Sequence, residues 1–362
     1  MKKIHIGVIG CGNISDIYLT NLRELESLEV VAVADLDHVK AVEKAEKYCI
    51  PHVLSVDELL KTEAIDLVLN LTIPAAHAEV SLRVLEAGKH VYSEKPLAIT
   101  LHDGEKVLAK AKEKGLFVGV APDTFLGGGL QTCKKLIEDG AIGEPVAATA
   151  FMMGHGPESW HPDPEFFYRA GAGPMFDMGP YYLTALINLI GPVRRLTGST
   201  RITSPERTIT SEPKYGQKIN VETPTHVAGI LDFENGAIGT MITSFDVWGS
   251  KTPFLEIYGT NGSLSVPDPN TFGGPVLVRK PGETEWAEVA FTHGSLENSR
   301  GIGVIDMVDA LHSGREPRAS GKLAYHVLEI MHGIHESSVK GEHYKMTSTC
   351  KQPEALPSEI LS

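Results

Sequence analysis

Cysteine is scarce in this chain, and the few cysteines are far apart. The 362 residues contain four, and no pair has a CxxC or other metal-like spacing. Such usage is typical of a reducing compartment, where disulfides are rare, and it does not suggest a zinc site. We therefore expect a cytoplasmic protein without a metal. The four cysteines are Cys11, Cys49, Cys133 and Cys350.

Positive charge and long apolar runs are also in short supply. The formal net charge is −13, whereas nucleic acids and anionic membrane surfaces select basic patches, so neither is expected as a partner. The opening MKKIHIGVIGCG begins like a signal peptide but breaks at once into glycine and polar residues, and no small-residue cleavage site follows. No stretch approaches the roughly 20 apolar residues of a membrane span.

The chain has the composition of a globular protein, with 42% hydrophobic and 22% charged residues. At 362 residues we expect roughly two domains. Short apolar runs alternate with amphipathic helical patterns in residues 1–123, which predicts βαβ units and a doubly wound parallel sheet. The predicted strands are 4–10, 30–35, 67–72, 90–94 and 116–121, and the predicted helices are 15–26, 38–48, 76–87 and 101–114.

The pattern changes in residues 124–346. Strand-like runs fill residues 193–291, with Asn-Gly pairs at 235–236 and 261–262 that favour hairpin turns, so the second domain is predicted to be α/β with a mostly antiparallel sheet. A strand is predicted over 145–153, and helices over 128–139, 178–190, 303–313 and 320–338, with Ser320 as an N-cap. The polar tail, residues 347–362, is interpreted as an arm or a disordered segment.

The first predicted strand runs into a GxGxx(small) turn, residues 10–15, which we call the glycine turn. Gly10 permits the tight turn, and Gly12 lets a pyrophosphate approach the backbone at the start of a helix. Asp35 ends the next strand, where a carboxylate accepts hydrogen bonds from the ribose hydroxyls of NAD and repels the 2′-phosphate of NADP. We therefore predict a site for NAD rather than NADP, to which the turn contributes Gly10, Cys11, Gly12, Asn13 and Ile14.

Two more turns leave the same carboxyl edge of the predicted sheet, where ligands gather. One contributes Thr72, Pro74 and His77 to the predicted cofactor site, with a capped helix start as the alternative interpretation. The other is Glu94-Lys95-Pro96, which we call the EKP turn. Lys95 can donate to a substrate hydroxyl or take part in its proton transfer, and Glu94 can hold the lysine or the nicotinamide ribose. A solvated surface ion pair is the alternative interpretation.

Two parts of the second domain carry candidate substrate residues. Asp177 and Tyr181 are four residues apart near a predicted helix start, which puts them on one side of the helix; an N-cap and a core tyrosine are the alternatives. The segment 154–173, which we call the aromatic loop, offers ring faces and polar groups to a sugar, although it could equally pack on itself. Its candidates are His155, Trp160, His161 and Arg169; Asp123 is a further candidate, and no residues complete a metal site around His155, His161 and Asp163.

Five segments together resemble the glucose-fructose oxidoreductase / inositol dehydrogenase family, Gfo/Idh/MocA, over nearly the whole chain. They are GVIGCGNIS, VVAVADLD, TIPAAHAEVSLRVLEAGKHVYSEKPLA, LIEDGAIGEP and GAGPMFDMGPYYLTALINLIGPV. The resemblance implies an N-terminal Rossmann domain and a C-terminal α/β domain whose large, open, mostly antiparallel sheet often forms the interface of a homo-oligomer, here a dimer or tetramer. The lysine of the family's EKP motif falls on Lys95, and the aspartate of its DxGxH-like motif falls on Asp177.

Two positions depart from the commonest family pattern. Many members have histidine where this chain has Tyr181, which leaves open whether Lys95 or Tyr181 accepts the proton, and APDTFLGGGLQTCKKL (121–136) replaces a basic stretch. The resemblance implies NAD-dependent oxidation of a secondary alcohol on a sugar, polyol or related carbohydrate, or the reverse reduction. An NAD-dependent glycosidase with transient sugar oxidation and a non-catalytic NAD-binding regulator are the alternatives.

Overall fold

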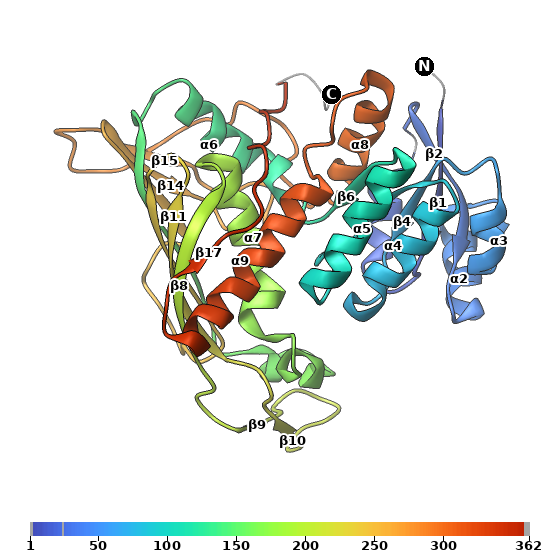
Figure 1. The fold of residues 1–362 in the computed structure, drawn as a ribbon, viewed down its shortest axis with the longest axis horizontal. Coiled ribbons are helices and arrows are strands. Elements are labelled where there is room, and N and C mark those ends of the chain that lie inside the picture. The colour runs from blue at the N-terminus through green and yellow to red at the C-terminus, as the bar shows by residue number, and fades with distance from the viewer. Residues whose placement is uncertain (1–2, 24, 358–362) are drawn as a thin grey trace. The chain divides into compact units, whose positions relative to one another are not determined.

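The computed structural model describes residues 3–23 and 25–357, and it divides into two compact units (Figure 1). The first unit is Met1–Gly127 with Glu297–Leu328, and the second is Gly128–Leu296 with Glu329–Ser362. The backbone N–H of Val120 donates to Ala319 at 2.9 Å, so the returning segment joins the first unit beside its last strand. The sequence-based division kept residues 124–346 together, so it assigned residues 297–328 to the second domain instead of the first.

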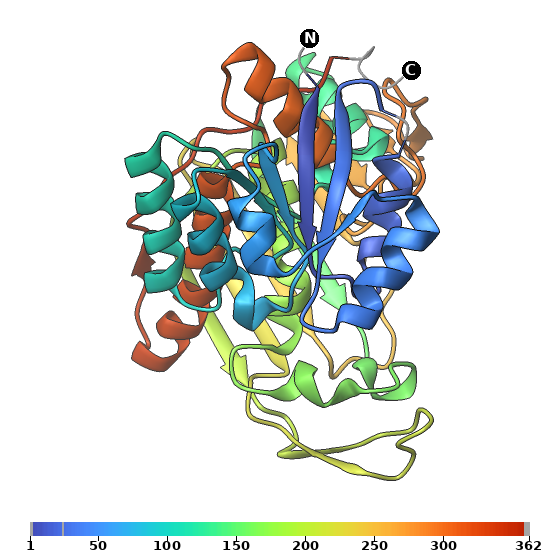
Figure 2. The same ribbon diagram turned by 90° about the vertical axis from the view of Figure 1, so that its right-hand side faces the viewer.

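The first unit is built on a six-stranded sheet in the order β3-β2-β1-β4-β5-β6, with every neighbouring pair parallel (Figure 2). The strand order reverses between β1 and β4, and this is the point at which such sheets bind ligands. The strands are β1 (Ile4–Ile9), β2 (Leu28–Ala34), β3 (His52–Val53), β4 (Leu67–Asn70), β5 (His90–Ser93) and β6 (Val118–Val120). The helices are α1 (Ser15–Asn21), α2 (His38–Tyr48), α3 (Val56–Lys61), α4 (His77–Glu86), α5 (Leu101–Lys114) and α8 (Ile302–Ser313), with 3-10 turns η1 (Pro74–Ala76) and η2 (Thr124–Leu126).

The predicted parallel sheet is confirmed. Capping residues mark the two ends of helix α5. Thr100 accepts the N–H of Asp103 at the start of α5, and Gly115 ends that helix in the left-handed conformation. The predictions missed β3 and α3, which have two and six residues and are too short to show a period. Ser55 and Glu58 form a capping box at α3, a signal that was present in the sequence. The predicted helix 15–26 ends at Asn21, and its residue 24 lies outside the described ranges.

The second unit is built on a nine-stranded sheet in the order β16-β15-β14-β13-β7-β12-β11-β8-β17. Only the central pair, β12 and β7, is parallel among the pairs in the described residues, so the mostly antiparallel sheet is confirmed. The strands are β7 (Pro145–Met153), β8 (Val193–Arg201), β11 (His226–Phe233), β12 (Ile238–Ser244), β13 (Leu255–Gly259), β14 (Gly262–Val266), β15 (Leu277–Arg279), β16 (Ala287–Glu288) and β17 (Tyr344–Lys345), and a separate hairpin pairs β9 (Glu206–Thr208) with β10 (Lys218–Asn220). The helices are α6 (Gly128–Glu138) and α7 (Gly173–Leu189), and α9 (Gly321–Lys340) continues from the first unit into the second at Glu329; η3 (Pro157–Ser159) and η4 (Pro164–Tyr168) lie in the aromatic loop.

Helix α7 begins five residues before the predicted start at 178. Pro174 takes an early helical position, where its missing N–H costs nothing, and Gly173 precedes it with φ +86°. Pro180 lies inside the helix and cannot donate to the carbonyl of Phe176. The helix persists because it is buried on almost every side. Asp177 is therefore not its N-cap, which is Ala172.

Residues 347–357 of the C-terminal tail, which we call the C-terminal strap, are hydrogen-bonded to the rest of the second unit. Buried Glu329 accepts the backbone N–H groups of Thr347 and Ser348 at 2.7 and 2.8 Å. Burial acts to raise the pKa of Glu329, but these donors hold it below its usual value. Further along, the N–H of Leu356 donates to Gln131 at 2.7 Å. The expected free arm is thus wrong for the strap, while residues 358–362 of the predicted tail lie outside the described residues.

Candidate functional site

The ends of four strands are level at the carboxyl edge of the parallel sheet. Ile9 is in register with Ala34 and with Asn70, and Asn70 is in register with Ser93. The next residue of each strand continues the ladder: Gly10 donates to Ala34, Leu71 to Ile9 and Glu94 to Asn70, all at 2.8–2.9 Å. The glycine turn, Asp35, the turn at 71–77 and the EKP turn are therefore brought to one edge of one sheet, as predicted.

The glycine turn fits a dinucleotide. Gly10 has φ +103°, and a Cβ there would lie 2.6 Å from the backbone of Leu71, so only glycine is accommodated. A Cβ on Gly12 would meet nothing within 4 Å, so the protein's own packing does not require glycine at that position. A ligand that approaches the backbone does require it. Ser15 is buried and donates its hydroxyl to the carbonyl of Gly12 at 2.6 Å, which ties the turn to α1.

Asp35, the residue directly after β2, also holds the glycine turn. Its Oδ2 accepts the N–H of Cys11 at 2.7 Å and its Oδ1 accepts that of Asp37 at 2.8 Å. Each carboxylate oxygen has a second lone pair, so both remain able to accept a hydroxyl. Burial, followed by the Asp35 charge, raises the pKa of the Cys11 thiol to about 12, so Cys11 stays protonated and serves as a small turn residue.

The turn at 71–77 is organised by two buried polar side chains. Asn70 Oδ1 accepts the hydroxyl of Thr72 at 2.7 Å, and its amide donates to the carbonyl of His77 at 3.0 Å. His77 is 1% exposed, with Nδ1 2.7 Å from the carbonyl oxygen of Pro96 and Nε2 2.9 Å from that of Thr72. Pro74 is exposed at the start of η1. His77 thus joins two turns from the inside, a placement that its sequence position did not reveal.

The carboxylate of Glu94 is engaged by protein donors. Oε1 accepts the hydroxyl of Tyr18 at 2.7 Å, and Oε2 accepts the N–H of Lys95 at 3.0 Å. Tyr18, on α1, is fully buried, and sequence reasoning missed it because a tyrosine on the inner side of a helix looks like core. Lys95 is half-buried and directly precedes Pro96 in the EKP turn.

Asp123 has a structural role in the first unit. It is 1% exposed, and its Oδ2 accepts the N–H groups of Gly301 and Gly303 at 2.8 and 3.0 Å, at the start of α8. Burial raises the pKa of Asp123 to about 6. Asp123 thus accepts two N–H groups at the start of α8 from a distant part of the chain, and its predicted substrate contact stays a prediction.

The aromatic loop in the second unit packs partly on itself and partly faces outward. The ring of His161 makes edge contacts with Phe166 and Phe167 at 5.3 Å, as the packing alternative expected. Trp160 is 66% exposed, and Arg169 is exposed at the end of η4. His155 stacks on Trp248 with ring centroids 3.3 Å apart, and Trp248 is itself 85% exposed. Trp248 is a candidate that the sequence pattern did not single out.

A buried ion network fixes the aromatic loop. Arg207 of β9 donates to Glu158 at 2.8 Å and also pairs with Asp246. Glu158 in turn accepts the hydroxyl of Tyr168, and the ring of Tyr168 lies under the Arg207 guanidinium. The β9–β10 hairpin therefore holds both 3-10 turns of the loop.

Asp177 and Tyr181 are one helical turn apart on α7, as the spacing predicted. Asp177 is half-buried and Tyr181 is 9% exposed. Pro180 interrupts the hydrogen-bond ladder at the turn that carries them.

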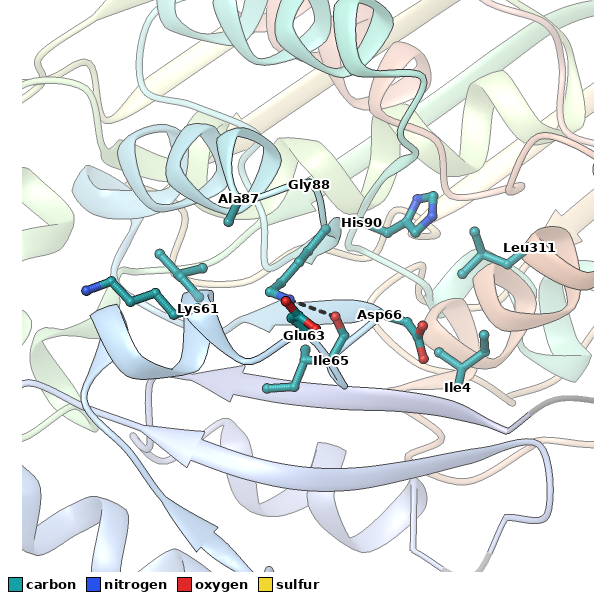
Figure 3. A pocket seen from close by; sticks show the side chains of 11 residues that line it. Ile4, Lys61, Glu63, Ile65, Asp66, Ala87, Gly88, His90 and Leu311 are labelled. Carbon is teal, nitrogen blue, oxygen red and sulfur yellow. Dashed lines mark hydrogen bonds between the residues drawn. The ribbon is translucent and has the colours of Figure 1, made fainter.

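A cavity of about 520 Å³ lies at the opposite, amino edge of the parallel sheet (Figure 3). Ile4 begins β1, Asp66 precedes β4 and His90 begins β5, and all three line it. The amine of Lys89 there donates to the carbonyls of Thr62 and Ile65 at 2.7 and 2.9 Å. None of the predicted site residues lines this cavity.

Residues 3–23 and 25–357 contain neither a grouped set of metal ligands nor a membrane-spanning helix. Within these ranges no three His, Cys, Asp or Glu side chains are grouped to hold a metal ion. No helix in the same ranges has the length and apolar character needed to span a bilayer.

Two known protein-family domains match the chain, one in each unit. Residues 4–121 match the oxidoreductase family with an NAD-binding Rossmann fold, and residues 130–265 match the GFO/IDH/MocA C-terminal domain. The chain belongs to the Gfo/Idh/MocA family. It is thus an oxidoreductase-family protein with an NAD-binding domain, as the motifs indicated.

Three relatives show which proteins the chain resembles in sequence. The 1,5-anhydro-D-fructose reductase of Ensifer adhaerens is 27% identical over 76% of this chain and 77% of its own length. The myo-inositol 2-dehydrogenase of Thermotoga maritima is 24% identical over 72% and 74%. The dTDP-3,4-didehydro-2,6-dideoxy-alpha-D-glucose 3-reductase of Saccharopolyspora spinosa is 34% identical over 55% and 60%.

Solved Gfo/Idh/MocA-like structures share the fold. Levoglucosan dehydrogenase in complex with NADH and levoglucosan superposes with a TM-score of 0.82 at 21% identity, covering 96% of this chain and 100% of that one. An NAD binding oxidoreductase from Klebsiella pneumoniae gives 0.83 at 22% identity, covering 96% and 99%.

Proposed function

We propose that this protein is an NAD-dependent dehydrogenase or reductase that interconverts a secondary alcohol and a ketone on a sugar, polyol or related carbohydrate. The observation that carries the proposal is the level carboxyl edge of the first unit, where the glycine turn, Asp35 and the EKP turn follow neighbouring strand ends. The relatives named as anhydrofructose reductase and inositol dehydrogenase support the substrate class.

The proposed reaction removes a hydride from the carbinol carbon and a proton from its hydroxyl, which leaves a ketone. NAD, when bound, supplies the hydride acceptor. Glycine-turn residues 10–14 and Asp35 hold its pyrophosphate and ribose, with Thr72, Pro74 and Glu94 nearby on the same edge. Lys95 or Tyr181 accepts the proton, and Asp177 orients the substrate hydroxyl. These last three assignments rest on the EKP motif and on the helix GPMFDMGPYY.

We also propose that the exposed rings and polar groups of the aromatic loop bind the carbohydrate. Trp160 offers a ring face, while His155 and Arg169 offer polar contacts. The stack of His155 on Trp248 supports this, because it presents one indole face outward.

A substrate panel tests the proposed function. The purified protein would be incubated with NAD and with sugars, inositols and glycosides in turn, while NADH is followed by its absorbance. We expect NADH to accumulate with at least one carbohydrate, with one ketone formed for each NADH. A hydrolysed glycoside without net NADH would indicate the glycosidase alternative, and tight NAD binding without turnover on any compound would indicate the regulator.

Cofactor preference for NAD over NADP should depend on Asp35. Asp35→Ser removes the carboxylate that repels a 2′-phosphate, so the ratio of kcat/KM for NAD over that for NADP should fall by about tenfold or more, the change produced by about 1.4 kcal/mol. Asp37→Ser is the matched control, because it removes a neighbouring carboxylate and keeps a residue able to cap α2. A ratio that stays within about twofold of the wild type in Asp35→Ser, against that tenfold step, would exclude Asp35 as the selector.

Assembly and location complete the proposal. We propose a homo-oligomer, a dimer or tetramer, that buries the outer face of the nine-stranded sheet, where Ile230 and Ile238 are 47% and 53% exposed. Sedimentation of the purified protein checks this: Ile238→Lys should lower the assembled mass. The free cysteines of the described chain, Cys49 among them exposed, support a cytoplasmic location.

A further inference from the structure

The EKP turn is held from one side by Tyr18. Glu94 joins the two, because its Oε1 accepts the Tyr18 hydroxyl at 2.7 Å and its Oε2 accepts the N–H of Lys95 at 3.0 Å. The backbone of Glu94 is itself fixed to the sheet, since its N–H donates to Asn70 at 2.9 Å. Burial raises the pKa of Tyr18 well above its usual value, so its hydroxyl remains a donor.

The same turn is held from the other side by His77. Its Nδ1 lies 2.7 Å from the carbonyl oxygen of Pro96, and its Nε2 lies 2.9 Å from that of Thr72. Both neighbours are acceptors, so the ring spans the two turns and donates to at least one of them. Burial lowers the pKa of His77, which favours the neutral ring with a single N–H. That N–H donates to one carbonyl only, and we place it on Nδ1, which has the shorter distance to its neighbour, Pro96.

Neither the Tyr18 hydroxyl nor the His77 ring nitrogens are needed to fill the core. Tyr18 is fully buried and His77 is 1% exposed, and an apolar ring of similar size would pack in either place. A phenylalanine at 18 would leave Glu94 Oε1 without its buried donor, however, and the peptide of Lys95 would lose its fixed support. The polar atoms of both residues therefore serve the turn.

We infer that Tyr18 and His77 are positioning residues for Lys95, which fix the backbone on both sides of the lysine and so aim its ammonium at the substrate. Tyr18 also lies on α1, directly after the glycine turn, so one hydrogen-bonded path runs from the cofactor-binding helix through Glu94 to Lys95. This inference rests on the proposed role of Lys95.

The test removes one oxygen atom. Tyr18→Phe should lower kcat by about tenfold or more, the effect of a lost hydrogen bond to a charged group, while the Kd for NAD stays close to the wild type. The unpaired Glu94 oxygen should also lower the thermal midpoint, but the protein should still fold. Tyr48→Phe is the matched control, because the Tyr48 hydroxyl also donates to a carboxylate, Asp16 at 2.8 Å, in the same unit but away from the EKP turn. It should retain full kcat.

A double variant separates positioning from general damage. If Tyr18 acts through Lys95, adding Tyr18→Phe to Lys95→Met should lower kcat no further, whereas an unrelated structural effect would multiply the two losses. His77→Gln gives an independent second measurement with the same expectations. Normal kcat in both Tyr18→Phe and His77→Gln, with Lys95→Met impaired, would overturn the inference alone. Normal kcat in Lys95→Met would overturn it together with the proposed role of Lys95.

Discussion

Lys95→Met should lower kcat by about 10²–10⁴-fold, the range typical for loss of a general acid–base group. Methionine keeps most of the aliphatic stem and removes the ammonium, so the half-buried backbone at the edge of the sheet should not change. The Glu94 contact that supports this residue uses the backbone N–H of Lys95, which the substitution leaves in place. NAD binding and the thermal midpoint should therefore survive.

The control for Lys95→Met is Lys106→Met, which makes the same change in charge on the same unit. Lys106 is exposed on α5 and pairs with Asp103 at 3.1 Å, so its loss should leave kcat unchanged. Steady-state kinetics and NAD titration on both variants decide the matter. A near-normal kcat in a folded Lys95→Met protein would reduce Glu94 and Lys95 to the solvated pair of the alternative interpretation.

Tyr181→Phe should also lower kcat strongly, by about 10²–10⁴-fold if the phenol is the base. Phenylalanine keeps the ring of a side chain that is 9% exposed, so packing and stability should be retained. An ordinary phenol has a pKa near ~10, so a base role at neutral pH requires a nearby positive charge that lowers it. Tyr181→His should keep part of the activity, because many family members have histidine at that position.

The pH–rate profile separates a catalytic phenol from a packing one. The wild type should show an ionisation below ~10 that moves or disappears in Tyr181→Phe. Tyr182→Phe is the matched control, since Tyr182 is the next residue on α7 and is buried too, but lies about 100° around the helix. Normal turnover in Tyr181→Phe would leave proton transfer to Lys95 alone.

Local patterns were enough to predict the edge of the first sheet. The strands are buried on both faces and read as apolar runs, so β1, β2, β4 and β5 were found with small errors in their ends. Because strands of a parallel sheet end at one edge, Asp35 and the EKP turn could be brought together without coordinates. In the second unit, the two Asn-Gly pairs correctly predicted hairpins of the antiparallel sheet.

Contacts between distant residues could not be predicted in this way. Asp123 was a candidate substrate residue, and the sequence did not show that it pairs with Gly301, 178 residues further along the chain. The strap was interpreted as a polar arm, but its backbone N–H groups donate to a buried glutamate, Glu329. Arg207 and Glu158 are 49 residues apart and gave no local signal. Each of these residues finds its partner only in the tertiary structure.

Deuterium transfer tests most directly whether this protein is a net redox enzyme on carbohydrates. A substrate found in the panel would be labelled with deuterium on the carbon that becomes the ketone, and incubated with NAD and the protein. We predict one deuterium in the reduced nicotinamide for each ketone formed. Label that stays in a hydrolysed product or passes to water, with no labelled NADH, would contradict the proposed function.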